Sequence, residues 1–325
     1  MHIGEIATCP ISLGGRITIA VIANPDLSSY YEDDGIVLLL DSRTGEEIDV
    51  QGSGRWTASN LCTVTAGDTI LLAGGCKDGT VELREPWTGD QVRVLRGHRG
   101  QIVKVCQVEA NGSPLLASAS LDGTIRLWDP ANGDHIRTFQ ADDHRPGSLC
   151  AIGTGAGSML ASFSGREIRL WDPANDRNMR TLEGHSGDFC ALCAVKDDDL
   201  FLLASGETEV DQVYINRGDV DEDAADYTIR LWNPASGEQV RIFEGHSAPV
   251  NSICSFSIRN RYLLASASDD KTVRLWNPMS RAPVLTIPVH YSAKSIMWGN
   301  DSLFVGLDNG ALAIKLEPSQ CSYSA

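Results

Sequence analysis

Three residue types that often act together in catalysis recur at regular positions along this chain. A histidine, a serine, an aspartate and a tryptophan follow one another in three separate segments. The sets are His98, Ser118, Asp122 and Trp128; His185, Ser205, Asp226 and Trp232; and His246, Ser266, Asp270 and Trp276. Serine, histidine and aspartate can form a hydrolytic triad. A hydrolase needs one such site, whereas this chain has three, so we predict that the sets are structural and that none of these residues is catalytic.

The hydrogen-bonding chemistry of the four side chains favours a closed network. An indole N–H only donates, a hydroxyl both donates and accepts, and a carboxylate can fix one tautomer of an imidazole. A buried network of this kind stabilises a fold only when every member has a partner. We therefore expect each set to be buried and fully bonded.

Each set lies in a unit that repeats along the chain. In the third unit, Leu115–Ser120 and Thr124–Trp128 are short apolar runs separated by Asp122-Gly123, and Asp-Gly between such runs is a strong hairpin signal. The central apolar residue of the second run recurs at Leu39, Leu83, Leu127, Leu170, Leu231, Leu275 and Ile314. The steps between them are 44, 44, 43, 61, 44 and 39 residues. A period near 44 residues with four strand signals per unit predicts an all-β repeat array.

The first strand signal of six units carries a cysteine, which we predict to lie at one common depth. These residues are Cys9, Cys62, Cys106, Cys150, Cys193 and Cys254, with Met297 in the seventh unit. Equivalent strands diverge from a common axis, so we expect free thiols rather than disulfides. The start of the chain has neither a basic region nor a long apolar run, which argues against a secretory signal. Together these features predict a cytoplasmic protein.

The composition excludes two classes of partner. The chain has 325 residues, 42% of them hydrophobic, and a net charge of −16. This acidic balance repels phosphate backbones and anionic lipids, and no apolar run approaches the roughly 18 residues of a membrane span. We expect neither nucleic acid nor a membrane as the partner.

Three units resemble a known family in the Gly-His dipeptide at their start and in the tryptophan at the end of their third strand. Gly97-His98, Gly184-His185 and Gly245-His246 begin them, and Trp128, Trp232 and Trp276 end their third strands. This pattern resembles the WD-repeat β-propeller family, in its bacterial form. The resemblance implies an all-β, seven-bladed propeller of four-stranded antiparallel blades, in a single domain over residues 1–325. The expected blades span about 1–50, 51–95, 96–140, 141–182, 183–243, 244–287 and 288–325.

The resemblance also implies a function. WD-repeat propellers are scaffolds or sensor modules, so we expect a non-catalytic protein without a cofactor, either monomeric or a domain of a larger chain. The common binding surface in the family is the face that carries the turns between second and third strands. The matching residues are Glu5, Asp33, Trp56, Lys77, Gln101, Leu121, Arg145, Asp188, Asn251, Asp269, Lys294 and Asp308. Acidic and aromatic residues favour a basic or mixed peptide or protein segment as the partner.

Four units lack part of the set. The fourth has Trp171 but carries Gly165 where the aspartate is expected, and the first, second and seventh have Leu40, Arg84 and Lys315 in place of the tryptophan. We expect packing rather than the polar network to hold these blades. We also expect residues Gln320 to Ala325 to supply the outer strand of the last blade.

One unit is longer than the others and contains an acidic insertion at residues 207–225. Its step is 61 rather than 44 residues, and its sequence Asp219-x-Asp221-x-Asp223 resembles a calcium loop. However, Ala224 and Arg230 stand where such a loop needs glycine and glutamate. A calcium or other metal site, a solvated acidic loop and a partner contact all remain open. An enzyme of unknown type is a further alternative to the scaffold.

Overall fold

The computed structural model describes residues 2–13, 16–24, 35–41, 56–141, 146–154, 157–164, 167–175, 177–185, 189–197, 200–207, 226–259, 261–280, 282–299 and 301–316. Every regular element in these ranges is a β-strand, as the repeat of short apolar runs predicts. No helix in this part of the chain has the length and apolar character needed to span a membrane. Most of the acidic insertion and the predicted closing segment Gln320 to Ala325 lie outside the described residues.

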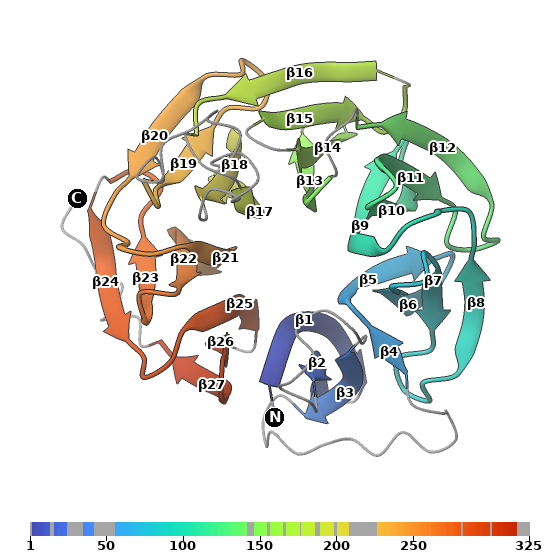
Figure 1. Cartoon of the computed structure of the whole chain (residues 1–325), viewed down its shortest axis with the longest axis horizontal. Coiled ribbons are helices and arrows are strands. Elements are labelled where there is room, and N and C mark those ends of the chain that lie inside the picture. Colours follow the sequence, from blue (N-terminus) through green and yellow to red (C-terminus); the bar gives the residue numbers. More distant parts are fainter. Residues whose placement is uncertain are drawn as a thin grey trace, which may run out of the picture.

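Antiparallel sheets stand side by side around a central opening (Figure 1). Six of them have four strands each, and we call these blades one to six in chain order. A further sheet at the end of the chain has three strands in the described residues, and we call it the three-stranded sheet. The structure therefore confirms an all-β propeller of four-stranded antiparallel blades, with six such blades rather than the predicted seven.

Strands follow the chain from the central opening to the rim of each blade. Blade one contains β1 (His2–Leu13), β2 (Arg16–Asn24), β3 (Gly35–Asp41) and β4 (Thr57–Ala58). Blade two contains β5 (Asn60–Ala66), β6 (Thr69–Gly75), β7 (Val81–Arg84) and β8 (Gln91–Leu95). Blade three contains β9 (Ile102–Ala110), β10 (Ser113–Ser120), β11 (Thr124–Trp128) and β12 (His135–Gln140).

The second half of the ring has the same order. Blade four contains β13 (Ser148–Thr154), β14 (Gly157–Ser164), β15 (Glu167–Asp172) and β16 (Arg177–Glu183). Blade five contains β17 (Phe189–Asp197), β18 (Leu200–Glu207), β19 (Ile229–Trp232) and β20 (Gln239–Phe243). Blade six contains β21 (Val250–Ile258), β22 (Arg261–Ser268), β23 (Thr272–Trp276) and β24 (Pro283–Pro288). The three-stranded sheet contains β25 (Ala293–Gly299), β26 (Ser302–Leu307) and β27 (Gly310–Lys315).

The middle hairpin of blade three has the predicted turn. Ala117 of β10 pairs with Leu127 of β11, and Asp122-Gly123 lies between these strands. Gly123 has a positive φ of 83°, a conformation that glycine adopts at little cost, and its N–H donates to the carbonyl of Ser120 at 3.1 Å. The dipeptide therefore reverses the chain as the sequence predicts.

The outer strand of blade one lies beyond its predicted boundary at residue 50. β4 pairs with β3, with Ala58 opposite Gly35 and Thr57 opposite Ile36. Only Ser59 separates β4 from β5, because this connection contains no Gly-His loop. Repeat length alone could not locate this boundary, since the missing loop shifts the outer strand toward blade two.

Five of the six aligned cysteines share one register, and Cys9 does not. Cys62, Cys106, Cys150, Cys193 and Cys254 each pair with an alanine of the second strand, which in turn pairs with the central leucine of the third. In blade one that alanine is Ala20, which pairs with Leu39 and, on β1, with Ala7. Cys9 lies two residues further along and pairs with Thr18. Residue type alone therefore misplaced β1, where irregularities interrupt the pairing on both sides of this position.

The three-stranded sheet differs from the blades in its third strand. Met297 pairs with Phe304, and Phe304 with Ala313, so Ala313 rather than the predicted Ile314 takes the position that Leu127 has in blade three. Most residues of β27 are exposed, including Leu312 at 39%, whereas Leu127 is fully buried. Among the described residues, the third strand of this sheet is therefore less buried than the third strand of blade three.

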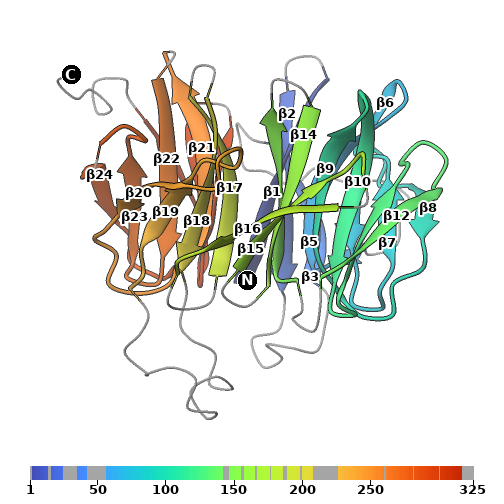
Figure 2. The same ribbon diagram turned by 90° about the horizontal axis from the view of Figure 1, so that it is seen from above.

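The core consists of clusters between neighbouring sheets. Trp128 and Leu116 of blade three pack with Ala73, Leu83 and other apolar residues of blade two, and the opposite side of blade three packs with Trp171 of blade four. Each first strand contacts the first strand of the next sheet, and β1 also contacts β25, so the ring is closed. The side view in Figure 2 shows that the ends of the strands lie at two opposite faces of the disc.

Candidate functional site

The predicted network of blade three is present and complete. The indole N–H of Trp128 donates to Ser118 Oγ at 2.8 Å, and Ser118 Oγ lies 2.8 Å from His98 Nε2. His98 Nδ1 lies 3.0 Å from the carboxylate of Asp122. Because a carboxylate only accepts, Nδ1 carries the imidazole proton and Nε2 accepts from the hydroxyl. Every polar group of the set therefore has a partner.

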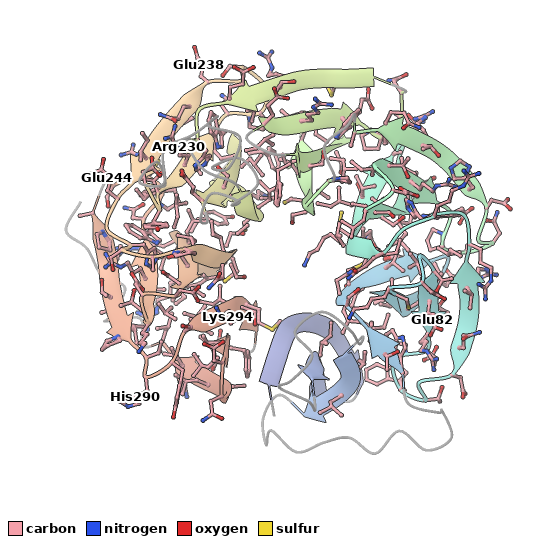
Figure 3. All side chains as sticks on the ribbon, viewed as in Figure 1. Glu82, Arg230, Glu238, Glu244, His290 and Lys294 are labelled. Atoms are coloured by element: carbon pink, nitrogen blue, oxygen red, sulfur yellow. The ribbon has the colours of Figure 1, made fainter. Side chains whose placement is uncertain are left out.

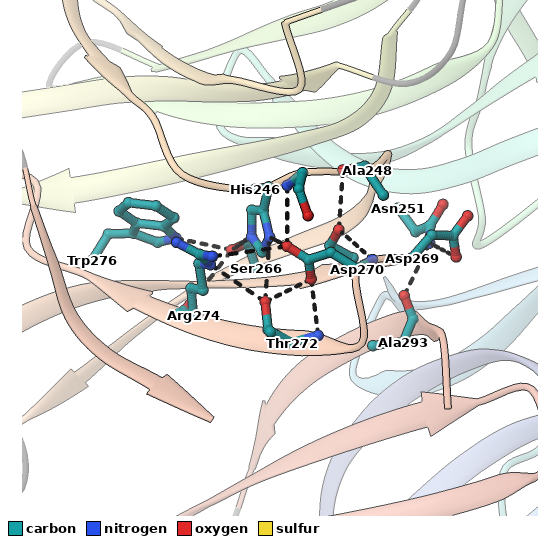
Figure 4. A network of polar contacts seen from close by, with 12 residues as sticks. His246, Ala248, Asn251, Ser266, Asp269, Asp270, Thr272, Arg274, Trp276 and Ala293 are labelled. Atoms are coloured by element: carbon teal, nitrogen blue, oxygen red, sulfur yellow. Dashed lines mark hydrogen bonds and ion pairs between the residues drawn. The ribbon is translucent and has the colours of Figure 1, made fainter. Parts of the chain in front are cut away.

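Blade six repeats this geometry (Figure 4). Trp276 Nε1 donates to Ser266 Oγ at 2.8 Å, His246 Nε2 lies 2.7 Å from that oxygen, and His246 Nδ1 lies 2.7 Å from Asp270. Thr272 is a fifth member, because its hydroxyl donates to Asp270 at 2.6 Å. The four predicted side chains of this blade therefore lie in one connected hydrogen-bonded set.

The threonine is a member that the sequence prediction missed. In blade three, Thr124 donates both its N–H and its hydroxyl to Asp122, at 3.0 and 2.6 Å. Asp-x-Thr occurs at the same place in blade five, as Asp226-x-Thr228, and in blade two, as Asp78-x-Thr80. This recurring spacing was the available signal. The threonine fixes the carboxylate that in turn orients the histidine.

Burial shows that these serines do not face a substrate. Ser118, Ser205 and Ser266 all have an exposed fraction of 0%. Each hydroxyl lies between an indole and an imidazole, which occupy its donor and acceptor positions. A serine nucleophile must reach a bound substrate, so the geometry supports the structural interpretation of the three sets.

The electrostatics of blade three depend on the same contacts. Burial alone would raise the pKa of Asp122, but hydrogen bonds from Thr124, from the Arg99 N–H and from His98 lower it to about 2. Burial lowers the pKa of His98, and the hydrogen bond to Asp122 opposes this shift only in part. The network therefore contains an ionised aspartate and a neutral histidine at neutral pH.

Blade five differs from the prediction at the carboxylate. His185 Nε2 lies 2.7 Å from Ser205 Oγ, and Trp232 donates to the same oxygen at 2.8 Å, as predicted. However, the carboxylate at His185 Nδ1 is Glu207, at 2.8 Å, and not Asp226. Glu207 is the last residue of β18 and the first residue of the predicted insertion. Asp226 instead accepts from Thr228 and pairs with Arg230 at 3.0 Å.

Blade four retains half of the network. Trp171 Nε1 donates to Ser162 Oγ at 2.8 Å, and Ser162 is fully buried. The sequence prediction named Trp171 but missed Ser162, although both occupy the same positions as Trp128 and Ser118. In the described part of this blade, one indole–hydroxyl bond accompanies the apolar packing.

The turns between second and third strands meet the starts of the first strands at one face of the disc. In blade three, the N–H of Leu121, just after β10, donates to the carbonyl of Gln101, just before β9, at 2.9 Å. In the same way, the N–H of Asp269 donates to the carbonyl of Pro249 at 3.1 Å. The N–H of Asp308 donates to the carbonyl of Ser292 at 3.2 Å. We call this surface the loop face. The repeated bond shows that predicted face residues from several sheets share it.

Three predicted residues contact one another where blade six meets the three-stranded sheet. Asn251 Nδ2 donates to Asp269 Oδ1 at 2.8 Å and to the carbonyl of Ala293 at 3.0 Å. Lys294 Nζ lies 2.5 Å from the same Asp269 oxygen. Figure 3 shows Lys294 near the central opening, whereas Glu238 and Glu244 lie at the rim. This polar cluster connects two sheets on the loop face.

The remaining predicted face residues have different outcomes. Lys77, Gln101, Leu121 and Asp308 are partly exposed, so they are available to a partner. Trp56 is 8% exposed and packs in the core with Leu61 and Leu72, so its assignment to the binding face was wrong. Trp56 directly precedes β4, the outer strand of blade one. Glu5 lies on β1, and the other three residues of the set, Asp33, Arg145 and Asp188, fall outside the described residues.

A hollow of about 530 Å³ lies on the opposite face, across blades three to five. Asn111, Gly112, Met159, Met179 and Arg180 contribute to its lining. It contains the turns between first and second strands rather than the predicted binding turns. This hollow is therefore a matched location against which the loop face can be tested.

The ring of antiparallel sheets and its indole–hydroxyl–imidazole–carboxylate sets define a β-propeller built from repeats. The family model for the WD domain, G-beta repeat, matches residues 89–129 and 237–277, the segments that end with the tryptophans of blades three and six. These matches and the propeller arrangement support the WD-repeat β-propeller family for this chain. No curated protein matched the chain. Propellers of this family commonly mediate protein interactions and typically act as non-enzymatic scaffolds.

Proposed function

We propose that this protein is a non-catalytic interaction platform that binds a protein or peptide partner on its loop face. The observation that carries the proposal is the polar cluster of Asn251, Asp269 and Lys294, which joins two sheets on that face. Fixed polar groups at the edge of a rigid ring recognise a partner at low entropic cost, because they need no ordering on binding.

The proposed partner segment is basic or of mixed charge. The chain has a net charge of −16, and Lys294 is already paired with Asp269, so the cluster presents little free positive charge. Opposite charge speeds association and disfavours acidic competitors. A basic partner segment therefore suits this surface, whereas the nucleic-acid backbone does not.

Paired substitutions on the two faces test the proposal. Partners captured by the purified chain from its source lysate are identified, and their affinity is then measured for Leu121→Asp, Asp308→Lys and Met179→Lys. Leu121 and Asp308 are on the loop face, and Met179, 53% exposed, lines the opposite hollow. We expect the two loop-face variants to weaken binding about tenfold or more and Met179→Lys to have no effect. The reverse pattern would overturn the choice of face.

We propose further that the three-stranded sheet is a seventh blade, which makes the ring seven-bladed. Its inner strand β25 contacts β21 on one side and β1 on the other, as the first strand of any blade contacts its neighbours. An experimental structure with a fourth strand on the outer edge of β27 would establish this count, and one with that edge bare would contradict it.

We propose that the protein lies in the cytoplasm and is either a monomer or a domain of a larger chain. Among the described residues, Cys106, Cys150, Cys193 and Cys254 are thiols rather than disulfides, which supports a reducing compartment. Sedimentation of the purified chain checks the monomer, and a fluorescent fusion in the source cell checks the location.

A further inference from the structure

Three metal-ligating side chains converge in blade five. One donor atom each of His185, Glu207 and Asp226 lies within 4.8 Å of the others. His185 precedes β17, Glu207 ends β18, and Asp226 lies just before β19, so three separate segments supply the groups. The residues that the structure describes contain no second group of this kind.

Blades three and six provide internal comparisons for this cluster. There, one aspartate both accepts from the threonine and faces the imidazole. In blade five these roles are divided between two residues. Asp226 accepts hydrogen bonds from the N–H and the hydroxyl of Thr228, at 2.9 and 2.7 Å, while Glu207 contacts His185. The position that has one carboxyl group in the other two blades therefore has two. The two residues are in contact, because Glu207 Oε1 accepts a hydrogen bond from the Asp226 N–H at 3.2 Å.

The cluster is enclosed but has one exposed side. The side chains of His185 and Glu207 are 0% exposed, whereas that of Asp226 is 35% exposed. Arg230 offsets the charge of Asp226 at 3.0 Å. The fully buried carboxyl group of Glu207 beside it still needs a proton or a further cation to be stable inside the protein. Asp226 provides the route by which an ion could enter from solvent.

We propose that this cluster binds a divalent transition-metal cation of the Zn²⁺ type. One imidazole nitrogen and two carboxylate oxygens suit zinc and its first-row neighbours, whereas calcium and magnesium prefer oxygen ligands alone. Water would complete the coordination on the exposed side of Asp226. Binding requires the proton of His185 to leave Nδ1, and in the neutral imidazole it then resides on Nε2 and is donated to Ser205 Oγ.

The proposed cation has a structural role that is separate from the loop-face function. Glu207 directly precedes residues 208–225 and Asp226 directly follows them, so one ion would join both ends of the insertion to His185. This differs from the calcium site considered from the sequence, because its ligands are His185, Glu207 and Asp226 instead of Asp219, Asp221 and Asp223. It also explains why the histidine partner in this blade is Glu207 rather than an aspartate like Asp122 or Asp270.

Calorimetric titration of metal-free protein with Zn²⁺ tests the proposal. We expect one equivalent to bind to the unaltered chain and the affinity to fall at least about 100-fold in Glu207→Gln and in Asp226→Asn. The matched control is Asp270→Asn, which removes the network carboxylate of blade six and should leave Zn²⁺ binding unchanged. Asp226→Asn keeps the test decisive if the buried Glu207→Gln variant does not fold.

Cobalt spectroscopy separates this cluster from the cysteines. Co²⁺ bound by His185, Glu207 and Asp226 should give weak visible bands without the strong near-ultraviolet absorption of cobalt–thiolate bonds. Three results would each overturn the proposal: no stoichiometric Zn²⁺ binding, binding that both blade-five variants retain, or a thiolate spectrum. Tighter binding of Ca²⁺ than of Zn²⁺ would also contradict it, because the imidazole would then not be a ligand.

Discussion

Ser118 is the residue on which the blade-three network depends. Its hydroxyl contacts both Trp128 Nε1 and His98 Nε2, at 2.8 Å each, in a fully buried position. Ser118→Ala removes both partners at once, and each buried polar group left without a partner costs about 1–3 kcal/mol. We expect the free energy of unfolding to fall by about 2–6 kcal/mol, measured by urea denaturation.

Ser162 supplies the control for this prediction. It accepts only from Trp171 among the network side chains described, at 2.8 Å, and is equally buried. Ser162→Ala should therefore cost about half as much as Ser118→Ala. Equal losses in the two variants would show that the histidine side of the network contributes nothing.

The pKa shifts in blade three predict a loss of stability in acid. The pKa of Asp122 is about 2 in the folded chain against an ordinary aspartate value of 3.8, so its contribution is present above about pH 4 and disappears as the pH falls toward 2. The lowered pKa of His98 acts in the same direction below pH 6.5, because the unfolded chain takes up the proton more readily. Asp122→Asn should be less stable at pH 7, and the difference should narrow by about 2 kcal/mol between pH 5 and pH 2. Urea denaturation over this pH range measures it, and a constant difference would contradict the assignment.

Residue types and spacing were sufficient to predict most of the polar networks. The spacing of the four network residues in blade three, His98, Ser118, Asp122 and Trp128, repeats in blade six. Residues with the same spacing in two repeats occupy the same positions and make the same contacts. Glu207 could not be found in this way, because it breaks the interval and belongs to the insertion by sequence. Burial of Trp56 also escaped prediction, because it depends on packing with Leu61 and Leu72 of blade two, which the local sequence does not show.

At the scale of the element, one aromatic stack holds the three-stranded sheet to blade six. Trp298 of β25 and Phe256 of β21 lie with ring centroids 4.5 Å apart and planes 20° from parallel. Trp298→Ala removes this contact from a sheet whose third strand is already exposed, so we expect a loss of about 2 kcal/mol. Hydrogen exchange should rise in β25 to β27 and remain unchanged in blade three.

Tyr291 is the matched control for this element. It lies two residues before β25 and is 45% exposed, so Tyr291→Ala should change stability by less than about 0.5 kcal/mol. If Trp298→Ala accelerates hydrogen exchange throughout the ring, the sheets unfold as one unit. The aromatic stack would then not stabilise the three-stranded sheet alone.

The strands were predictable where the repeat is regular, and the failures have a common physical cause. The Asp-Gly hairpin of blade three follows from local turn chemistry, which the sequence contains directly. The register of β1 depends on irregularities in pairing near Ile3 and Cys9, and the position of β4 depends on a missing loop. Such features are decided by the neighbouring strand and are not visible in the strand itself.

At the scale of the whole molecule, the ring protects the thiols on its inner strands. Burial raises the pKa of Cys193 to about 11, and burial also raises the pKa values of Cys106, Cys150 and Cys254. Only the thiolate reacts with iodoacetamide, so these residues should be labelled about 100-fold more slowly than free cysteine at pH 8. Mass spectrometry of the peptides measures each site, and labelling should become fast in urea. Rapid labelling of Cys106 in the folded chain would contradict the closed ring.

The family and the propeller arrangement were predictable because a 44-residue period repeats one structural unit. The three-stranded sheet was the weakest part of that prediction, since its third strand contains Ala311 and Ala313 instead of large apolar residues. The sequence offers no strong pattern there, and packing against blade six decides its position.

The connection between β4 and β5 makes one sector of the loop face different from its neighbours. The other five connections between neighbouring sheets contain four to seven residues, whereas this one contains only Ser59. A ring of near-identical sectors would let a partner settle in several rotated positions of similar energy. One shortened sector removes that ambiguity, so a partner lying across the face can distinguish one rotational setting from the others.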